Sequence, residues 1–320
     1  MHMSNFNNRV FGCVLVKSIN SNYNADFSHQ PRTLPNGIVY ATDKALKFAV
    51  KHFLKKEYPD AKILYFKNLK NDFVPMSLEE AYDSMNFDEK SRKKAPVAKN
   101  LLSCLDIRLF GATFAMKGKS KEDNVAISIH GPVQINHGVN IWKENNIFSE
   151  QISSPFRKPD EKSEEKDATT LGRQSKLQEG HYLHHFSINP KNLNVIIKNT
   201  GPDTQSLSTA DITKLKTALR FGVTYYDSAA KAGTDNEALI WVQLKEDSKR
   251  VLPNFSQLVK MDKKNGKVTY DLGGLKTVLA DNDSEIEAVE IYYLKESVAL
   301  ENEPAAKTKK YDLTSGNEIQ

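Results

Sequence analysis

The chain has 320 residues, of which 39% are hydrophobic and 27% are charged, and 45 basic against 40 acidic side chains leave a net charge of +5. This composition is typical of a globular protein of one or two domains, and no apolar run is long enough to cross a membrane. The mild positive charge permits a polyanionic partner without requiring one. The N-terminus has no hydrophobic signal segment, so we expect a cytoplasmic protein. Cys13 and Cys104 lie in apolar surroundings, which favours buried free thiols.

The N-terminal segment combines a core strand with a long polar loop. Residues 9–17 (Arg-Val-Phe-Gly-Cys-Val-Leu-Val-Lys) predict a buried strand, and residues 18–37 are rich in Asn, Ser, Pro and Gly without periodicity. So long a loop directly after a core strand is usually functional. Its candidate ligand-binding side chains are Asn20, Asn22, Asn24, Ser28 and Arg32.

A helix is predicted over residues 44–58, capped by Thr42 or Asp43 and ended by Pro59. One face of this helix is apolar, and a second stripe contains Lys44, Lys47, Lys51 and Lys55. The lysines are either a solvated face or a phosphate-binding surface beside the polar loop.

The next segments predict a strand over residues 61–66, helices over 77–85 and 97–105, and then a pair of strands. The pair comprises residues 106–115 and 129–138, with a charged turn between them, and we expect its rim to present Arg108, Gln134 and Asn136. Gly111, Gly131 and Gly138 would allow another backbone to approach closely there.

Periodicity is lost over residues 141–180, so this segment is either a disordered linker or an arm that becomes ordered on a partner. Beyond it, strands are predicted over residues 182–188, 237–244 and 287–294, a helix over 209–221, and a disordered polar tail after 301. This order predicts an α+β fold with a ferredoxin-like or RRM-type sheet that carries long insertions.

Several side chains are candidates for chemistry. His181, His184 and His185 could bind a metal, but on a strand only two of them share a face, which favours ordinary histidines. Asp26 could position a metal or a 2′-hydroxyl for RNA cleavage, although it has no evident carboxylate partner. Tyr225, Tyr226 and Lys231 offer aromatic planes and a cation, as single-stranded nucleic acid requires, or are ordinary packing at a helix end.

Residues 106–115 (Asp-Ile-Arg-Leu-Phe-Gly-Ala-Thr-Phe-Ala) and 129–138 (Ile-His-Gly-Pro-Val-Gln-Ile-Asn-His-Gly) carry a family resemblance. In this order they resemble the crRNA-binding backbone subunit, of the RAMP superfamily, in type I CRISPR surveillance complexes (Cascade), in particular the Csh-type subunit of subtype I-B. Residues 35–44 resemble the start of that family's first helix, and residues 169–190 resemble its thumb insertion returning to the sheet. Residues 218–231 resemble its second helix and the basic turn that follows, here with Lys231 and two alanines.

The resemblance implies a modified RRM-like palm over residues 1–140 and 181–300, with a helical insertion at about 59–105, a thumb at 141–180 and the tail at 301–320. It also implies copies that assemble head to tail along one crRNA, with no catalytic residue, cofactor or metal in the subunit. The expected partners are crRNA, target DNA paired to it, further copies of the chain, the large subunit, a subunit capping the repeat end, and a recruited helicase-nuclease.

The expected RNA-binding residues are Asn20, Asn22, Asn24, Ser28, Arg32, Lys44, Lys47, Arg108, Gln134, Asn136, Arg173 and Lys231. Candidate thumb wedges between bases are Ile147, Phe148, Ile152, Phe156 and Leu171. Two alternatives remain: a metal-dependent endoribonuclease that acts through Asp26, as in related type III backbone subunits, and an RRM-type monomer that binds cellular RNA.

Overall fold

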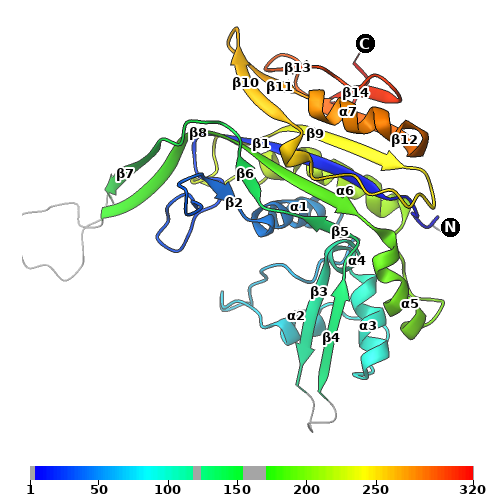
Figure 1. The fold of residues 1–320 in the computed structure, drawn as a ribbon. Helices are drawn as coiled ribbons and strands as arrows, with labels where there is room; N and C mark the ends of the chain where they lie inside the picture. The colour runs from blue at the N-terminus through cyan, green and yellow to red at the C-terminus, as the bar shows by residue number, and fades with distance from the viewer. Residues whose placement is uncertain (1–3, 118–123, 154–170, 320) are drawn as a thin grey trace, which may run out of the picture.

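A computed structural model describes residues 4–117, 124–153 and 171–319, which form a mixed α+β fold around one large sheet (Figure 1). The described strands of this central sheet run in the order β14 (Thr308–Asp312), β12 (Ile286–Tyr293), β9 (Thr234–Leu244), β1 (Val10–Ser21), β8 (Leu171–Ile188), β6 (Gly138–Asn140) and β2 (Tyr40–Ala41). Two further strands, β5 (Val133–Ile135) and β7 (Ile147–Ser153), pair with opposite ends of β8. In the described ranges, no helix is long and apolar enough to span a membrane.

Strand β1 is buried on both faces, as its continuous apolar run predicted. Val14 and Val16 point into a core beneath α1 (Asp43–Glu57) and α6 (Thr209–Tyr225). Cys13 and Leu15 point into a second core. That core lies beneath α7 (Gly273–Asp281) and a small sheet of β10 (Lys260–Lys264), β11 (Lys267–Asp271) and β13 (Val298–Glu301). Helices therefore cover one face of the sheet and the C-terminal elements cover the other (Figure 1).

Helices α1 and α6 form where they were predicted, although Thr42, the N-cap residue of α1, makes no side-chain capping bond and donates to Asn24 instead. Helix α1 buries the apolar stripe that includes Leu46, Val50 and Phe53. Helix α6 begins at a capping box in which Asp211 N donates to Ser208 Oγ and Ser208 N donates to the Asp211 carboxylate. The other described helices are α2 (Leu78–Ser84), α3 (Lys94–Ser103), α4 (Leu105–Phe110) and α5 (Asn194–Thr200).

Two strand predictions in the insertion are wrong. Residues 106–110 belong to helix α4, and the hairpin begins only at β3 (Gly111–Met116), which pairs with β4 (Val125–His130). Residues 61–66 form no strand. Instead, the backbone N–H groups of Leu64 and Tyr65 donate to the Asp106 carboxylate at 3.0 and 2.8 Å. One buried side chain thus replaces a strand partner for this segment.

The predicted close backbone approach occurs where α4 turns into β3. Gly111 has φ +73°, and a Cβ there would lie 2.2 Å from the carbonyl oxygen of Ile129 and 2.4 Å from the nitrogen of Gly131. At Gly138, the close neighbour is a side chain, because a Cβ would lie 2.3 Å from Nε2 of His184. Glycine is therefore required by both space and backbone conformation at Gly111, and by space alone at Gly138.

The expectation that Arg108 lies on the rim of a strand is wrong. Arg108 is on α4, only 6% exposed, and its Nε and Nη2 donate to the two carboxylate oxygens of Asp211 at 3.1 and 2.9 Å. Its Nη1 donates to the Leu102 carbonyl and to Gln205 Oε1. This guanidinium joins the inserted helices to the start of α6 rather than facing a ligand.

Residues 302–319 are ordered, contrary to the prediction of a disordered tail. Strand β14 adds to the edge of the sheet in parallel with β12, and Leu313 is buried. The Arg220 guanidinium on α6 donates to the Leu313 carbonyl at 2.7 Å. The tail is polar because an edge strand buries few of its side chains.

Replacing Arg108 with Ala should lower the free energy of unfolding by about 3–5 kcal/mol, because it leaves the buried Asp211 carboxylate without its cation. Urea denaturation measures the loss. Arg92→Ala is the matched control, since Arg92 also pairs with two carboxylates (Glu79 and Asp83) but has a side chain 48% exposed. That variant should lose less than about 1 kcal/mol. Equal losses in the two variants would contradict the structural role of Arg108.

Candidate nucleic-acid interface

The β7–β8 pair extends beyond the central sheet as an arm, which we define as residues 147–153 and 171–177 (Figure 1). Three segments distant in sequence meet at its root: the end of β1 with residues 22–39 (the first loop), residues 226–233 after α6, and β8 near residue 175. Hydrogen bonds join them, from Asn22 N to Ala230 O (2.7 Å), Asn22 Nδ2 to Ser175 O (3.1 Å), Ile19 N to Gly233 O (2.8 Å) and Gln174 Nε2 to Ala229 O (3.3 Å).

The predicted polar residues of the first loop divide into those that build it and those that are exposed. Asn24 Oδ1 accepts from Thr42 N and Oγ1, both at 3.0 Å, and so ties the loop to the start of α1. Arg32 Nε donates to the carbonyl of residue 25 at 3.1 Å, and Asn22 is buried. Asn20 lies at the end of β1 rather than in a loop, has φ +48° and is exposed, as is Ser28.

Asp26 forms a turn in this loop. Its Oδ1 accepts from Ser28 N (2.8 Å), Ser28 Oγ (2.7 Å) and Gln30 N (3.0 Å). These bonds, that from the Ser28 hydroxyl foremost, lower the pKa of the Asp26 carboxyl. No group of three or more His, Cys, Asp or Glu side chains in the described residues could hold a metal ion.

Lys231 is a half-buried cation at the root of the arm. Its Nζ donates to the Tyr23 carbonyl and lies 5.5 Å from the Tyr23 ring centroid and 5.8 Å from that of Tyr226. Burial lowers its pKa to about 8. Within the described part of the chain, no carboxylate forms an ion pair with it. An ammonium has three hydrogens to donate, so a group with one carbonyl partner keeps capacity for an anion.

The lysine stripe of α1 is neither a solvated face nor a continuous phosphate surface. Lys51 Nζ donates to the Tyr65 carbonyl at 2.6 Å, and Lys55 Nζ donates to Asn68 Oδ1. Burial lowers the pKa of both lysines. Lys47 pairs with Asp43 at 3.1 Å, whereas the side chain of Lys44 is 83% exposed. Lys51 and Lys55 therefore hold the segment around residues 65–68 against α1, whereas Lys44 and Lys47 do not.

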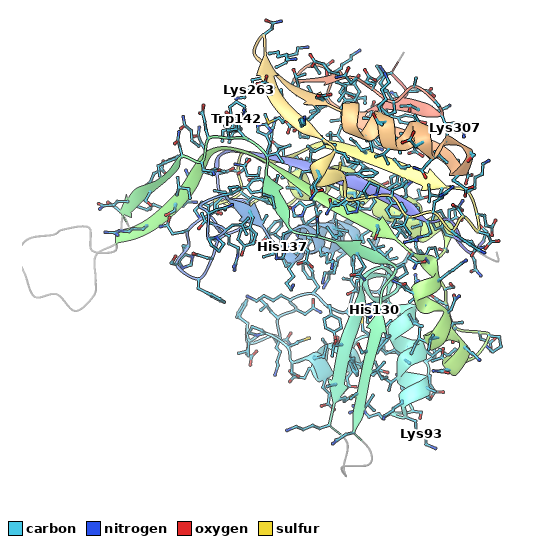
Figure 2. All side chains as sticks on the ribbon, in the orientation of Figure 1. Lys93, His130, His137, Trp142, Lys263 and Lys307 are labelled. Carbon is cyan, nitrogen blue, oxygen red and sulfur yellow. The ribbon has the colours of Figure 1, made fainter. Side chains whose placement is uncertain are left out.

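Gln134 and Asn136, the two remaining predicted rim residues, lie along the edge of β8 that does not pair with β1. Gln134 is exposed on β5, and its Nε2 donates to the Gly131 carbonyl at 2.8 Å. Asn136 Oδ1 accepts from His185 N at 2.8 Å, so this side chain continues the pairing between strands. The neighbouring His137 lies beside the start of α1, where Asp43 N donates to its Nδ1 (Figure 2).

The arm is a strand pair, so the expectation of an irregular segment over 141–180 is wrong for its described part. Of the wedge candidates, Ile147 and Ile152 are 36% and 48% exposed and Phe148 is half-buried. Leu171 is the first residue of β8 and pairs with Ser153, and Phe156 lies outside the described residues. Arg173 is exposed and faces Gln151 across the ribbon.

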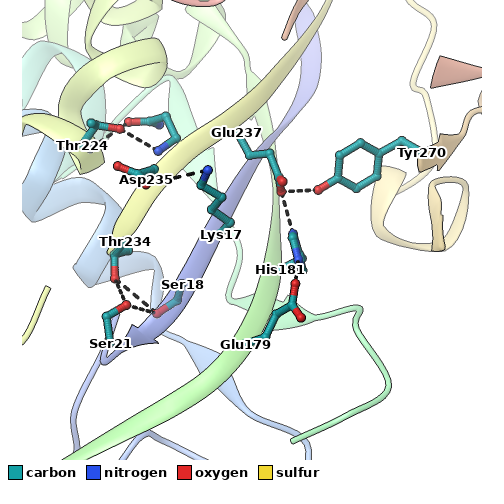
Figure 3. Close-up of polar contacts among 11 residues, drawn as sticks. Lys17, Ser18, Ser21, Glu179, His181, Thr224, Thr234, Asp235, Glu237 and Tyr270 are labelled. Atoms are coloured by element: carbon teal, nitrogen blue, oxygen red, sulfur yellow. Dashed lines mark hydrogen bonds and ion pairs between the residues drawn. The ribbon is translucent and has the colours of Figure 1, made fainter. Parts of the chain in front are cut away.

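A buried polar network anchors the arm where β8 enters the sheet (Figure 3). His181 is 1% exposed; its Nδ1 lies 2.7 Å from Glu237 Oε2 and its Nε2 lies 3.1 Å from Glu179 Oε1. Tyr270 Oη donates to the same Glu237 oxygen and so connects the C-terminal sheet. Beside it, Lys263 lies over the Trp142 ring at 5.0 Å (Figure 2).

The three histidines of β8 alternate as predicted. Burial opposes a charge on His181, but its hydrogen bonds with Glu237 and Glu179 outweigh burial and raise its pKa. Burial lowers the pKa of His184 and of His185 to about 4. His184 lies between Tyr23 Oη and the Asn136 carbonyl on the helical face, and His185 accepts from Phe255 N on the other. Each histidine thus has a structural partner.

The prediction from sequence missed the groups that hold the root together. Ser18, Ser21 and Thr234 form a buried triangle of hydroxyls with separations of 2.7 to 3.2 Å (Figure 3). Its one signal in the sequence is the change from an apolar run to mainly polar residues within β1 after Val16. Thr234, on β9, is more than 200 residues from the two serines, so no local pattern reveals the triangle.

The sheet, the helices beside it and the exposed arm with a cationic root define an α+β protein with a candidate nucleic-acid interface. A sequence profile of the family described as CRISPR-associated protein Cas7 matches residues 8–304, so the chain belongs to this family. The predicted membership is thereby confirmed at the level of the family.

Solved structures share the fold. One chain from a "CRISPR RNA-guided surveillance complex" has a TM-score of 0.53 and 12% identity, covering 95% of this chain and 94% of that one. Another, from a "CRISPR RNA-guided surveillance complex, pre-nicking", has a TM-score of 0.54 and 13% identity, covering 95% and 96%. No curated protein matches the sequence significantly.

The raised pKa of His181 predicts a pH-dependent stability. A folded-state pKa above the ordinary value of 6.5 contributes stability that is complete below about pH 6.5 and is lost as pH rises through the folded pKa. The contribution of His181 to the melting temperature, measured as wild type minus His181→Gln, should therefore fall as pH rises from about 6 to about 9. His181→Gln should be less stable than wild type at about pH 6, and the difference should shrink at higher pH. The wild-type minus His185→Gln difference should show the opposite trend, a rise with pH that ends at about pH 7, because His185 is neutral in the folded state and takes up a proton on unfolding below that pH. An unchanged slope in His181→Gln would contradict the assignment.

Proposed function

We propose that the chain is a crRNA-binding backbone subunit of a type I-B Cascade, of the Csh type, which assembles in several copies along the guide RNA. Membership of the Cas7 family and the fold shared with chains of surveillance complexes support this role. The observation that carries it is Lys231, a desolvated ammonium with no carboxylate partner among the described residues, at the point where the first loop meets the arm. A phosphate of single-stranded RNA would satisfy it.

The order of the central strands supports an RRM-like palm. β9, β1, β8 and β6 are neighbours and pair antiparallel, and α1 follows β1 as α6 follows β8 along the chain. This is the arrangement of a ferredoxin-like sheet. The palm comprises residues 1–140 and 181–300 and carries the helical insertion at about 59–105. The arm belongs to a thumb over residues 141–180.

In this proposal, the RNA contacts come from exposed groups around the root and along the arm. Asn20, Ser28, Lys44 and Arg173 supply donors that are exposed, and Lys231 supplies the desolvated cation. Asn22, Asn24 and Arg32 hold the first loop in shape. Arg108 has no part in binding, because its guanidinium is saturated by internal partners.

The proposed partners are crRNA, target double-stranded DNA recognised through it, further copies of the chain, the large subunit and the subunit at the repeat end. Base pairing reads the target while the protein holds the guide backbone without sequence preference. The chain is a cytoplasmic, non-enzymatic component of antiviral defence, and a recruited helicase-nuclease cuts the DNA. Filament growth needs two unlike faces on each copy, because head-to-tail contacts do not close.

Lys231→Gln should weaken retention of single-stranded RNA to a similar extent for every spacer sequence, because a phosphate contact carries no sequence information. The slope of log K against log salt concentration should decrease in magnitude by about 0.7. Filter binding at several salt concentrations measures both. Lys276→Gln, at an exposed lysine of α7, is the matched control and should bind as wild type. A loss confined to some spacers would contradict a phosphate contact.

The endoribonuclease alternative is tested with the assembled complex, complementary RNA and a divalent metal. We expect no metal-dependent cleavage in wild type or in Asp26→Ala, because the Asp26 carboxylate is used within its own turn. Metal-dependent cuts that disappear in Asp26→Ala would overturn the non-enzymatic role.

A further inference from the structure

The first loop presents an aromatic ring to solvent. Phe27 is 99% exposed, the highest value among the large hydrophobic side chains of the described residues, and Phe73 follows at 82%. The neighbours of Phe27 in sequence are polar, from Asp26 on one side to Ser28, His29 and Gln30 on the other. A single ring on a polar loop is not a broad apolar patch, which is what the core of a protein–protein interface needs.

The turn that carries Phe27 is held in one shape. Asp26 N donates to the Gln30 carbonyl at 2.8 Å and His29 N donates to the Asp26 carbonyl at 3.2 Å. His29 has φ +64°, which closes the turn. The Asp26 carboxylate adds the three bonds described above, all on Oδ1. The ring is thus presented by a preorganised backbone, so a ligand that stacks on it has little chain entropy to remove.

We propose that Phe27 stacks on an unpaired nucleobase of the bound RNA and that Asp26 is the residue that positions it. This inference rests on the proposed function and adds a base-stacking site to it. The choice of RNA rests on the loop itself, since it also carries Ser28 and meets Lys231 at the root. An aromatic plane on a loop that also carries donors and contacts a cation offers the groups that hold single-stranded nucleic acid without reading its sequence.

The geometry of Asp26 separates this role from catalysis. All three side-chain bonds fall on one oxygen, and the amide oxygen of asparagine can accept them equally. Asp26→Asn should therefore keep the turn and the RNA affinity, whereas Asp26→Ala should open the turn and weaken binding. A metal-binding or catalytic carboxylate would be lost in both variants.

The test compares two single-stranded RNAs of equal length, one with all its bases and one with a run of abasic ribose residues. Phe27→Ala should bind the complete RNA roughly 5- to 150-fold more weakly than wild type, the range expected for one stacked base. On the abasic RNA the two proteins should bind equally. Phe27→Trp should bind the complete RNA at least as well as wild type. The salt dependence should not change, because no phosphate contact is removed.

Phe73→Ala is the control for the loss of an exposed ring from a tight turn elsewhere and should bind as wild type. If wild type binds neither RNA, the proposed function fails together with this inference. If wild type binds but Phe27→Ala binds equally well, or loses the same factor on both RNAs, only the inference fails. A Phe27→Ala variant with unchanged RNA affinity but weaker self-association would assign the ring to a neighbouring copy and overturn the stacking role.

Discussion

Burial of both faces of the central sheet is the constraint on which the rest of this structure depends. Side chains of β1 point alternately into a core under two helices and a core under the C-terminal elements. An isolated RRM binds RNA on the open face of its sheet, with aromatic side chains in the strands. That face is covered here, so polar and cationic groups can reach a ligand only where strands end. The root of the arm is such a place, because β1 ends and β9 begins there beside β8.

The distribution of cations follows from the same packing. A net charge of +5 gives little indication of where a polyanion would bind. Lys51, Lys55 and Arg108 donate to internal carbonyl, amide and carboxylate oxygens, and so they join residues 65–68 to α1 and α4 to α6. Lys231 differs from Lys51 and Lys55 because the Asp106 carboxylate favours the charged form of those two lysines, whereas burial alone acts on the Lys231 ammonium. A half-buried charge of this kind is costly unless a partner neutralises it, which makes it a better indicator of a binding site than a row of surface lysines.

The elements that the sequence predicted well are those with strong local signals. The apolar run of β1, the stripe of α1 and the helical segment predicted over residues 209–221 each place an element within a few residues. The failures have non-local causes. Residues 106–110 form part of helix α4 instead of a strand. Asp106 on that helix accepts hydrogen bonds from the backbone of Leu64 and Tyr65, and so residues 61–66 form no strand either. The tail is ordered by Arg220, some 93 residues earlier in the chain. Of the candidate interface, the first loop and Lys231 could be predicted, whereas its hydroxyl triangle could not.

The arm has little core of its own, and this bears on how the protein assembles with other molecules. Six of the seven residues of β7 are exposed, and its contacts with β8 are mainly polar, such as Ser149 Oγ with Ser175 Oγ at 2.8 Å and Lys176 with Glu150 at 2.9 Å. A two-stranded ribbon of this kind is marginally stable in water on its own. Its root supplies one source of order through His181 and its carboxylate partners, but the outer residues have no core beneath them. The ribbon therefore gains most from a surface outside its own chain, and a nucleic-acid strand held between successive copies would provide one along its whole length.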